Sequence, residues 1–228
     1  MRPRRAYARG RTFVNRANAA LAITFVLALA ATTFAALCAR AAAPTRITAF
    51  GDSLTAGLGL APSESFPVRL AARLEADGYT VKIENAGVSG DTSSGGLARL
   101  NWVLGDRPQV VLVELGANDM LRGLDPKLTR ANLDQTLARL LAAHVKVLLV
   151  GMLAPPNFGA DYQRDFNGIY PELAKKYRVP LYPFFLDGVA LDPKLNQPDG
   201  LHPNAAGVAV IVARITPYVE RLLGDPAE

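Results

Sequence analysis

The run Gln109-Val110-Val111-Leu112-Val113-Glu114 limits the possible folds of this chain more than any other stretch. Its four central residues are apolar and three of them are valine. This pattern predicts a β-strand with protein on both of its faces. Such strands belong to parallel sheets that helices cover on either side. A further buried strand is expected at residues 47–50, directly before Gly51.

Strand-like runs alternate with amphipathic stretches along the rest of the chain. The remaining strands are predicted at 79–84, 145–150 and 179–182, and helices at about 65–78, 92–104, 125–144 and 166–177, with a last helix opened by Pro203. Five strands separated by helices predict an α/β protein, a three-layer α/β/α domain with a five-stranded parallel sheet. Among the possible strand orders we expect the flavodoxin-like order.

Residues 1–41 have the pattern of an export signal peptide. Arginines up to Arg16 precede an apolar run over 19–39, and Ala39-Arg40-Ala41 fits a small-x-small cleavage motif. We expect cleavage after Ala41, a single domain over residues 42–228, and a periplasmic or secreted location. The alternative is an uncleaved anchor, because an apolar run of about 20 residues can span a bilayer. Contact with a membrane is expected only through this segment, if it stays uncleaved.

Charge and cysteine content exclude several classes of function. The net charge of +5 comes from residues 1–41, which hold seven arginines and no acidic residue, so 18 basic and 20 acidic residues remain. A near-neutral domain without a basic stripe does not indicate a nucleic-acid partner. Cys38 is the only cysteine, so the expected domain has no disulfide, cysteine nucleophile or cysteine-ligated zinc.

A serine follows the strand at 47–50, where α/β proteins present reactive groups. Ser53 stands in Gly51-Asp52-Ser53-Leu54, but a serine at such a turn more often caps a helix. It needs a base. His202 follows Asp199 by three residues, and a tight turn would let this carboxylate bind Nδ1 and leave Nε2 for the Ser53 proton. The alternative is a capping turn with an incidental histidine. His144, between a helix and a strand, is expected to be structural.

Loops after two other strands offer donors for a developing oxyanion. The backbone N–H groups of Ser53 and Gly90 and the side-chain amide of Asn118 are candidates, although Asn118 could instead close an Asx turn. Four aspartates also raise the alternative of a metal site: Asp52, Asp91, Asp119 and Asp199. We do not favour it, because His202 would be the sole nitrogen ligand and no metal motif is present.

Four stretches together resemble the blocks of the SGNH, or GDSL, hydrolase family. They occur in the family's order and are Gly51-Asp52-Ser53-Leu54, Gly90-Asp91-Thr92-Ser93, Gly116-Ala117-Asn118-Asp119 and Asp199-Gly200-Leu201-His202-Pro203. The resemblance covers residues 46–223. The stretches 89–100, 113–116 and 169–171 are similar to the subgroup of bacterial periplasmic arylesterases, lysophospholipases and acyl-CoA thioesterase I.

The resemblance implies an SGNH hydrolase fold and a role for each matched residue. Ser53, Asp199 and His202 would form the catalytic triad, and Ser53, Gly90 and Asn118 the oxyanion hole. The family's acyl-site loop corresponds to residues 153–159, from which we expect substrate contacts by Leu153, Pro155, Asn157 and Phe158. No metal or other cofactor is implied.

We therefore expect an exported serine esterase whose partner is a small-molecule ester or lipid. Aryl and acyl esters are the expected substrates, with thioesters and lysophospholipids as further candidates. A carbohydrate O-deacetylase on the same fold is one alternative, although Trp102, the only indole for stacking a sugar, lies in a helix away from the site loops. A non-catalytic lipid- or sugar-binding domain is the other.

Overall fold

The computed structural model describes residues 43–226, and its centre is the strand β3 (Val110–Glu114), which is buried throughout. The other strands are β1 (Thr45–Gly51), β2 (Val81–Gly87), β4 (Lys146–Val150) and β5 (Leu181–Tyr182). All pairings are parallel and the order is β2-β1-β3-β4-β5. This is the flavodoxin-like order, so the predicted fold class is confirmed.

The strand register brings the carboxyl ends of four strands to one edge of the sheet. Gly51 pairs with Gly87 of β2 and with Glu114 of β3, and Glu114 pairs in turn with Val150 of β4. Loops that follow these strands therefore start side by side. In a parallel sheet this edge is where a site made from several loops can form.

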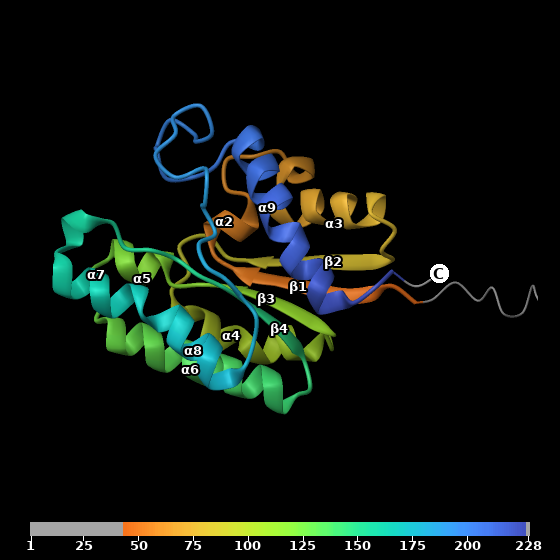
Figure 1. Cartoon of the computed structure of the whole chain (residues 1–228), viewed down its shortest axis with the longest axis horizontal. Coiled ribbons are helices and arrows are strands. Elements are labelled where there is room, and N and C mark those ends of the chain that lie inside the picture. Colours follow the sequence, from red (N-terminus) through yellow and green to blue (C-terminus); the bar gives the residue numbers. More distant parts are fainter. Residues whose placement is uncertain (1–42, 227–228) are drawn as a thin grey trace, which may run out of the picture. The chain divides into compact units, whose positions relative to one another are not determined.

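Helices cover both faces of the sheet (Figure 1). One layer consists of α3 (Phe66–Ala76) and α9 (Ala205–Leu223), and the other of α4 (Ser93–Gly105), α6 (Pro126–Ala142) and α8 (Ile169–Tyr177). Shorter helices lie in the connections: α2 (Ser53–Ala56), η1 (Pro62–Glu64), α5 (Ala117–Leu121), η2 (Pro156–Phe158) and α7 (Ala160–Asn167). The core between the layers includes the fully buried rings of Phe50, Phe66, Phe166, Phe185 and Tyr170.

Two helix boundaries differ from the sequence prediction. The helix expected at 166–177 is two helices, α7 and α8, with Gly168 between them. Pro203 does not open the last helix, because the Asn204 side chain accepts the amide hydrogens of Ala206 and Gly207 and caps α9 one residue later. Pro203 instead forms an isolated bridge with Asn196.

The predicted export segment, its cleavage site and Cys38 lie outside the described residues. Within residues 43–226, no helix is both long and apolar enough to cross a membrane.

Candidate active site

The first strand ends in a turn that carries Ser53 at the carboxyl edge of the sheet. β1 stops at Gly51, Asp52 follows, and Ser53 is the first residue of α2. The Asp52 side chain accepts the amide hydrogen of Leu54 at 3.0 Å and caps this helix. A Cβ at Gly51 would overlap Oγ1 of Thr55, so the tight turn requires glycine at this position.

His202 contacts Ser53 from the long loop between β5 and α9. Its Nε2 lies 2.8 Å from Ser53 Oγ, and its Nδ1 lies 2.7 Å from Oδ2 of Asp199. Backbone hydrogen bonds from His202 and Leu201, at 3.0 and 2.9 Å, lower the pKa of Asp199 to about 2. The ionised carboxylate favours the tautomer with hydrogen on Nδ1, which leaves Nε2 to accept the Ser53 proton. The structure thus brings these three residues together.

Two backbone amides at this edge are free to bind a ligand. Among residues 43–226, the N–H groups of Ser53 and Gly90 have no acceptor. Gly90 has a φ of 80°, in the left-handed region that favours glycine. Free, rigidly held N–H groups beside a nucleophile are suited to stabilising an oxyanion.

The side-chain amide of Asn118 also lies here, but both of its hydrogens are engaged. Nδ2 donates to Oδ2 of Asp52 at 3.0 Å and to the carbonyl oxygen of Asp91 at 2.9 Å. These bonds fix the amide in one orientation. To bind an oxyanion as well, Asn118 must share one of the two hydrogens with it.

A cavity of about 330 Å³ adjoins Ser53 and His202. Its other lining residues are largely apolar: Asp52, Leu54, Leu58, Gly90, Ala117, Asn118, Met120, Leu121, Met152, Leu186 and Leu201. Such a lining suits an acyl or aryl group rather than a sugar. Sequence reasoning missed its apolar members, although Leu54, Ala117 and Leu201 stand inside the motif blocks.

The segment predicted to contact substrate contributes differently from what we expected. Met152, which precedes it, lines the cavity, whereas Leu153, Pro155, Asn157 and Phe158 are not among the lining residues. The ring of Phe158 stacks on Tyr162, with centroids 5.4 Å apart. Contact between these four residues and a substrate remains a prediction.

Two buried carboxyl groups, those of Asp52 and Glu114, lie at the turn that carries Ser53. Burial raises the pKa of Asp52 to about 6, although hydrogen bonds from Leu54 and Asn118 oppose the shift. Burial raises the pKa of Glu114 well above its usual range, and the Asp52 carboxylate adds to the shift. Oε2 of Glu114 accepts the hydroxyl of Thr55 at 2.8 Å. Neither carboxyl group was predicted as a site residue beyond the metal alternative for Asp52. For Glu114, the signal that could have found it is an acid at the end of an apolar strand.

The four aspartates considered as metal ligands have separate protein partners. Arg99 pairs with Asp91 at 2.7 Å, and Asp119 accepts hydrogen bonds from Ser93 and Thr129. In the described part of the chain, no cluster of three or more His, Cys, Asp or Glu residues is arranged to hold a metal ion.

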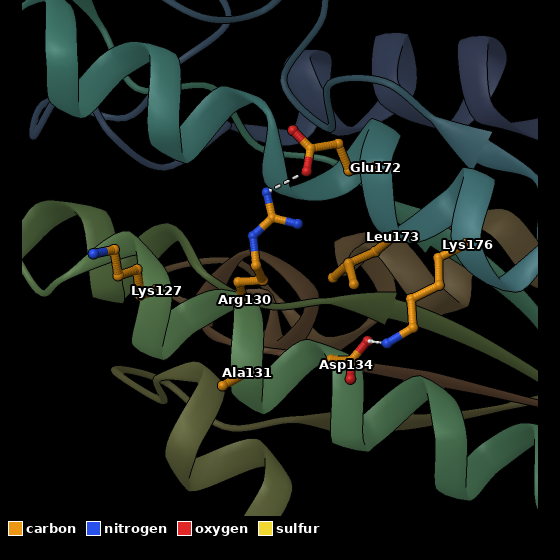
Figure 2. Close-up of a pocket in the computed structure, with 7 residues that line it drawn as sticks. All are labelled: Lys127, Arg130, Ala131, Asp134, Glu172, Leu173 and Lys176. Carbon is orange, nitrogen blue, oxygen red and sulfur yellow. Dashed lines mark hydrogen bonds and ion pairs between the residues drawn. The ribbon is translucent and has the colours of Figure 1, made fainter.

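A second groove, between α6 and α8, lacks comparable chemistry (Figure 2). It is lined by Lys127, Arg130, Ala131, Asp134, Glu172, Leu173 and Lys176. Its charges pair across the helices, Arg130 with Glu172 at 2.7 Å and Lys176 with Asp134 at 2.5 Å. These ion pairs join two helices, and none of the lining residues forms a nucleophile–base pair.

His144 lies away from the candidate site. It follows α6 with a φ of 59° and precedes β4, so it stands at the amino-terminal edge of the sheet. The site described here uses the opposite edge. Trp102 lies on α4 and is 79% exposed.

Comparison with known proteins relates most of the domain to one family. The profile of the GDSL-like Lipase/Acylhydrolase family matches residues 49–210. The chain is 40% identical over 174 residues to esterase TesA of Pseudomonas aeruginosa, covering 76% of this chain and 87% of the relative. It is 44% identical over 166 residues to thioesterase 1/protease 1/lysophospholipase L1 of Escherichia coli K12, covering 72% and 78%.

A solved structure extends the likeness to three dimensions. The psychrotrophic esterase EstA from Pseudoalteromonas sp., inhibited by monoethylphosphonate, superposes with a TM-score of 0.75 at 32% identity. The superposition covers 79% of this chain and 100% of that chain.

Proposed function

The chain belongs to the GDSL-like lipase/acylhydrolase family, and we propose that it is a serine esterase that acts through Ser53, His202 and Asp199. The single observation that carries this proposal is the distance of 2.8 Å between Ser53 Oγ and His202 Nε2. A serine oxygen at hydrogen-bond distance from a base, itself oriented by a third group, is the arrangement that activates a nucleophile.

The proposed reaction has two halves. Ser53 Oγ bonds to the ester carbonyl carbon while His202 Nε2 takes the hydroxyl proton, and the resulting imidazolium is stabilised by Asp199. The tetrahedral intermediate collapses, the bond to the leaving group breaks, and His202 returns the proton to it. Water then attacks the acyl-enzyme with His202 again as base, which releases the acid and restores Ser53.

The free N–H groups of Ser53 and Gly90 support an oxyanion hole at the same point. We assign Asn118 as a third donor that shares one hydrogen between its protein acceptor and the oxyanion. The mechanism needs no cofactor. Preorganised donors of this kind stabilise the charge that develops in the transition state, and each contributes about 10²–10³ to kcat.

The apolar cavity supports acyl or aryl esters as substrates. Relatives named thioesterase and lysophospholipase make thioesters and lysophospholipids further candidates, because all three classes present a carbonyl carbon to the same groups. The phosphonate inhibition of EstA supports a nucleophilic serine in this family. No observation on this chain favours the carbohydrate O-deacetylase or the non-catalytic alternative.

Hydrolysis of p-nitrophenyl acetate and labelling by a fluorophosphonate probe test the proposal. The wild-type protein should hydrolyse the ester and take up the probe, and Ser53→Ala should do neither. His144→Ala, which removes the histidine at the other edge of the sheet, should behave as wild type. Full activity of Ser53→Ala would reject the proposal, and hydrolysis without labelling would reject the serine mechanism.

We also propose that the domain is exported, on the pattern of residues 1–41. Mass spectrometry of the protein secreted or released from the periplasm tests this. A mature chain that starts at Ala42 is expected, and a full-length chain held in the membrane fraction would support the anchor instead.

A further inference from the structure

Arg99, on α4, joins three segments that meet below the candidate site. Its Nε donates to Oδ2 of Asp91 at 2.7 Å, and its two terminal nitrogens donate to the carbonyl oxygens of Ala86 and Gly51, each at 2.8 Å. The guanidinium also lies 4.5 Å from the centroid of the Phe50 ring. One side chain thus holds the ends of β1 and β2 and the loop that follows β2.

Two of these contacts, those with Gly51 and Asp91, are close to assigned oxyanion donors. Gly51 lies two residues before Ser53, and Asp91 directly follows Gly90. The carbonyl oxygen of Asp91 accepts a hydrogen from Asn118 at 2.9 Å. Arg99 binds the segment that leads to the Ser53 amide, and its partner Asp91 adjoins the Gly90 amide and accepts a hydrogen from the Asn118 side chain. The two residues together therefore connect all three donors.

The surroundings leave this pair little freedom to move. The side chains of Arg99 and Asp91 are only 14% and 12% exposed, so their ion pair is weakly screened by solvent. Gly95 makes room for it, since a Cβ there would overlap Oδ1 of Asp91 and lie 2.9 Å from its Cγ. The planar guanidinium, with its fixed fan of N–H donors, fits three acceptors that a lysine ammonium cannot match.

We propose that Arg99, paired with Asp91, is a positioning residue that sets the relative placement of the three oxyanion donors. This inference rests on the proposed esterase function. Arg99 does not line the cavity, so it acts through the donors and not on the substrate itself. Its loss should weaken binding of the tetrahedral state more than binding of the ester.

The experiment compares Arg99→Met, Arg99→Lys and Asp91→Asn with Arg139→Gln. Arg139, on α6, is a matched control. It donates to Asn101, which lies on α4 as Arg99 does, and neither residue lines the cavity. The measurements are kcat and KM for p-nitrophenyl acetate, the inhibition constant of phenylboronic acid, which forms a tetrahedral adduct with serine, and the melting temperature. Wild type and Ser53→Ala are measured alongside.

We expect kcat of Arg99→Met to fall by about 10- to 100-fold, with KM nearly unchanged and boronate inhibition weakened by a similar factor. Arg99→Lys should lose nearly as much of both kcat and boronate affinity as Arg99→Met. Asp91→Asn should lose about tenfold in each, and Arg139→Gln should match wild type in both.

A folded Arg99→Met protein with wild-type kcat would overturn the inference, and so would a loss of kcat without weaker boronate binding. If Arg99→Met does not fold, Asp91→Asn decides by the same two criteria. Wild-type hydrolysis that requires Ser53 secures the proposed function separately, so these outcomes would overturn the positioning role alone.

Discussion

One carboxylate, that of Asp199, contacts His202 at two points. Oδ2 lies 2.7 Å from Nδ1 of the ring, and Oδ1 accepts the backbone amide hydrogen of the same residue at 3.0 Å. The ring and the backbone of His202 are thereby held by one side chain three positions earlier. Since the Asp199 side chain is 45% exposed, this geometry comes from the local turn and does not depend on deep burial.

Asp199→Asn should lower kcat for p-nitrophenyl acetate by about 10⁴-fold. The neutral amide cannot stabilise the imidazolium, and it can bind the wrong tautomer of His202. The melting temperature should change little, because the replaced group is half exposed. Steady-state kinetics and thermal unfolding of the same preparations check both expectations.

Asp192→Asn is the matched control for that prediction. Asp192 lies in the same loop between β5 and α9, and its Oδ1 accepts the amide hydrogen of Lys194, two residues on, at 2.9 Å. It makes no contact with a histidine among the described residues. Near wild-type kcat is expected, and an equal loss in both variants would show that any change in this loop disables the enzyme.

Asn118→Ala should lower both activity and stability. We expect kcat to fall by about 10²–10³-fold, the usual effect of removing one oxyanion donor. The buried Oδ2 of Asp52 would lose its donor, at a cost of about 1–3 kcal/mol in the free energy of unfolding. Kinetics at a temperature where the variant is fully folded, with urea unfolding, separates the two effects. A kcat loss below tenfold would remove Asn118 from the oxyanion hole.

Sequence patterns were sufficient for the features that depend on local chemistry. The apolar run at 110–113 located β3, and the alternation of strands and helices led to the parallel sheet. The Asp199–His202 contact also followed from spacing, because a turn of three residues limits where the carboxylate can lie. The parallel order then placed Ser53 and Asn118 at one edge.

Features set by long-range packing were not predictable in the same way. Arg99 and its acceptor Gly51 are separated by 48 residues, and no periodicity indicates that they meet. Leu186 lines the cavity from a loop without a regular pattern. At α9, two plausible helix starts are adjacent, and the cap formed by Asn204 prevailed over Pro203 because its side chain satisfies two free amide hydrogens.

Replacing Asp52 by asparagine should change how stability depends on pH. The pKa of Asp52 is raised from 3.8 to about 6 in the folded protein. Between these values the native state holds a proton that the unfolded chain has released, so the free energy of unfolding falls as pH rises through this window. The loss is complete above about pH 6 and amounts to about 3 kcal/mol at about 1.4 kcal/mol per pKa unit.

Urea unfolding of wild type and Asp52→Asn at pH 4 and pH 7 measures this effect. The variant loses contacts of the Asp52 side chain at both pH values. Only the change in its free energy of unfolding between pH 4 and pH 7 is therefore diagnostic. Relative to wild type, the variant should gain about 2 kcal/mol in the free energy of unfolding on going from pH 4 to pH 7, less than the full shift because pH 4 already lies above the unfolded pKa of 3.8. An unchanged difference would mean that the pKa of Asp52 is not raised in the folded protein.

Leu186→Trp and Phe158→Ala together determine which segment contacts the acyl chain. Leu186 lines the cavity beside Ser53, and an indole there would fill part of its volume of about 330 Å³. We therefore expect Leu186→Trp to lower kcat/KM for p-nitrophenyl octanoate by about 10- to 100-fold, with less effect on the acetate, because overpacking excludes the longer chain first. If the 153–158 segment lies outside the acyl site, Phe158→Ala should leave the ratio of kcat/KM for the octanoate to kcat/KM for the acetate nearly unchanged. A selective loss on octanoate in Phe158→Ala, with no selectivity change in Leu186→Trp, would assign the acyl chain to that segment instead.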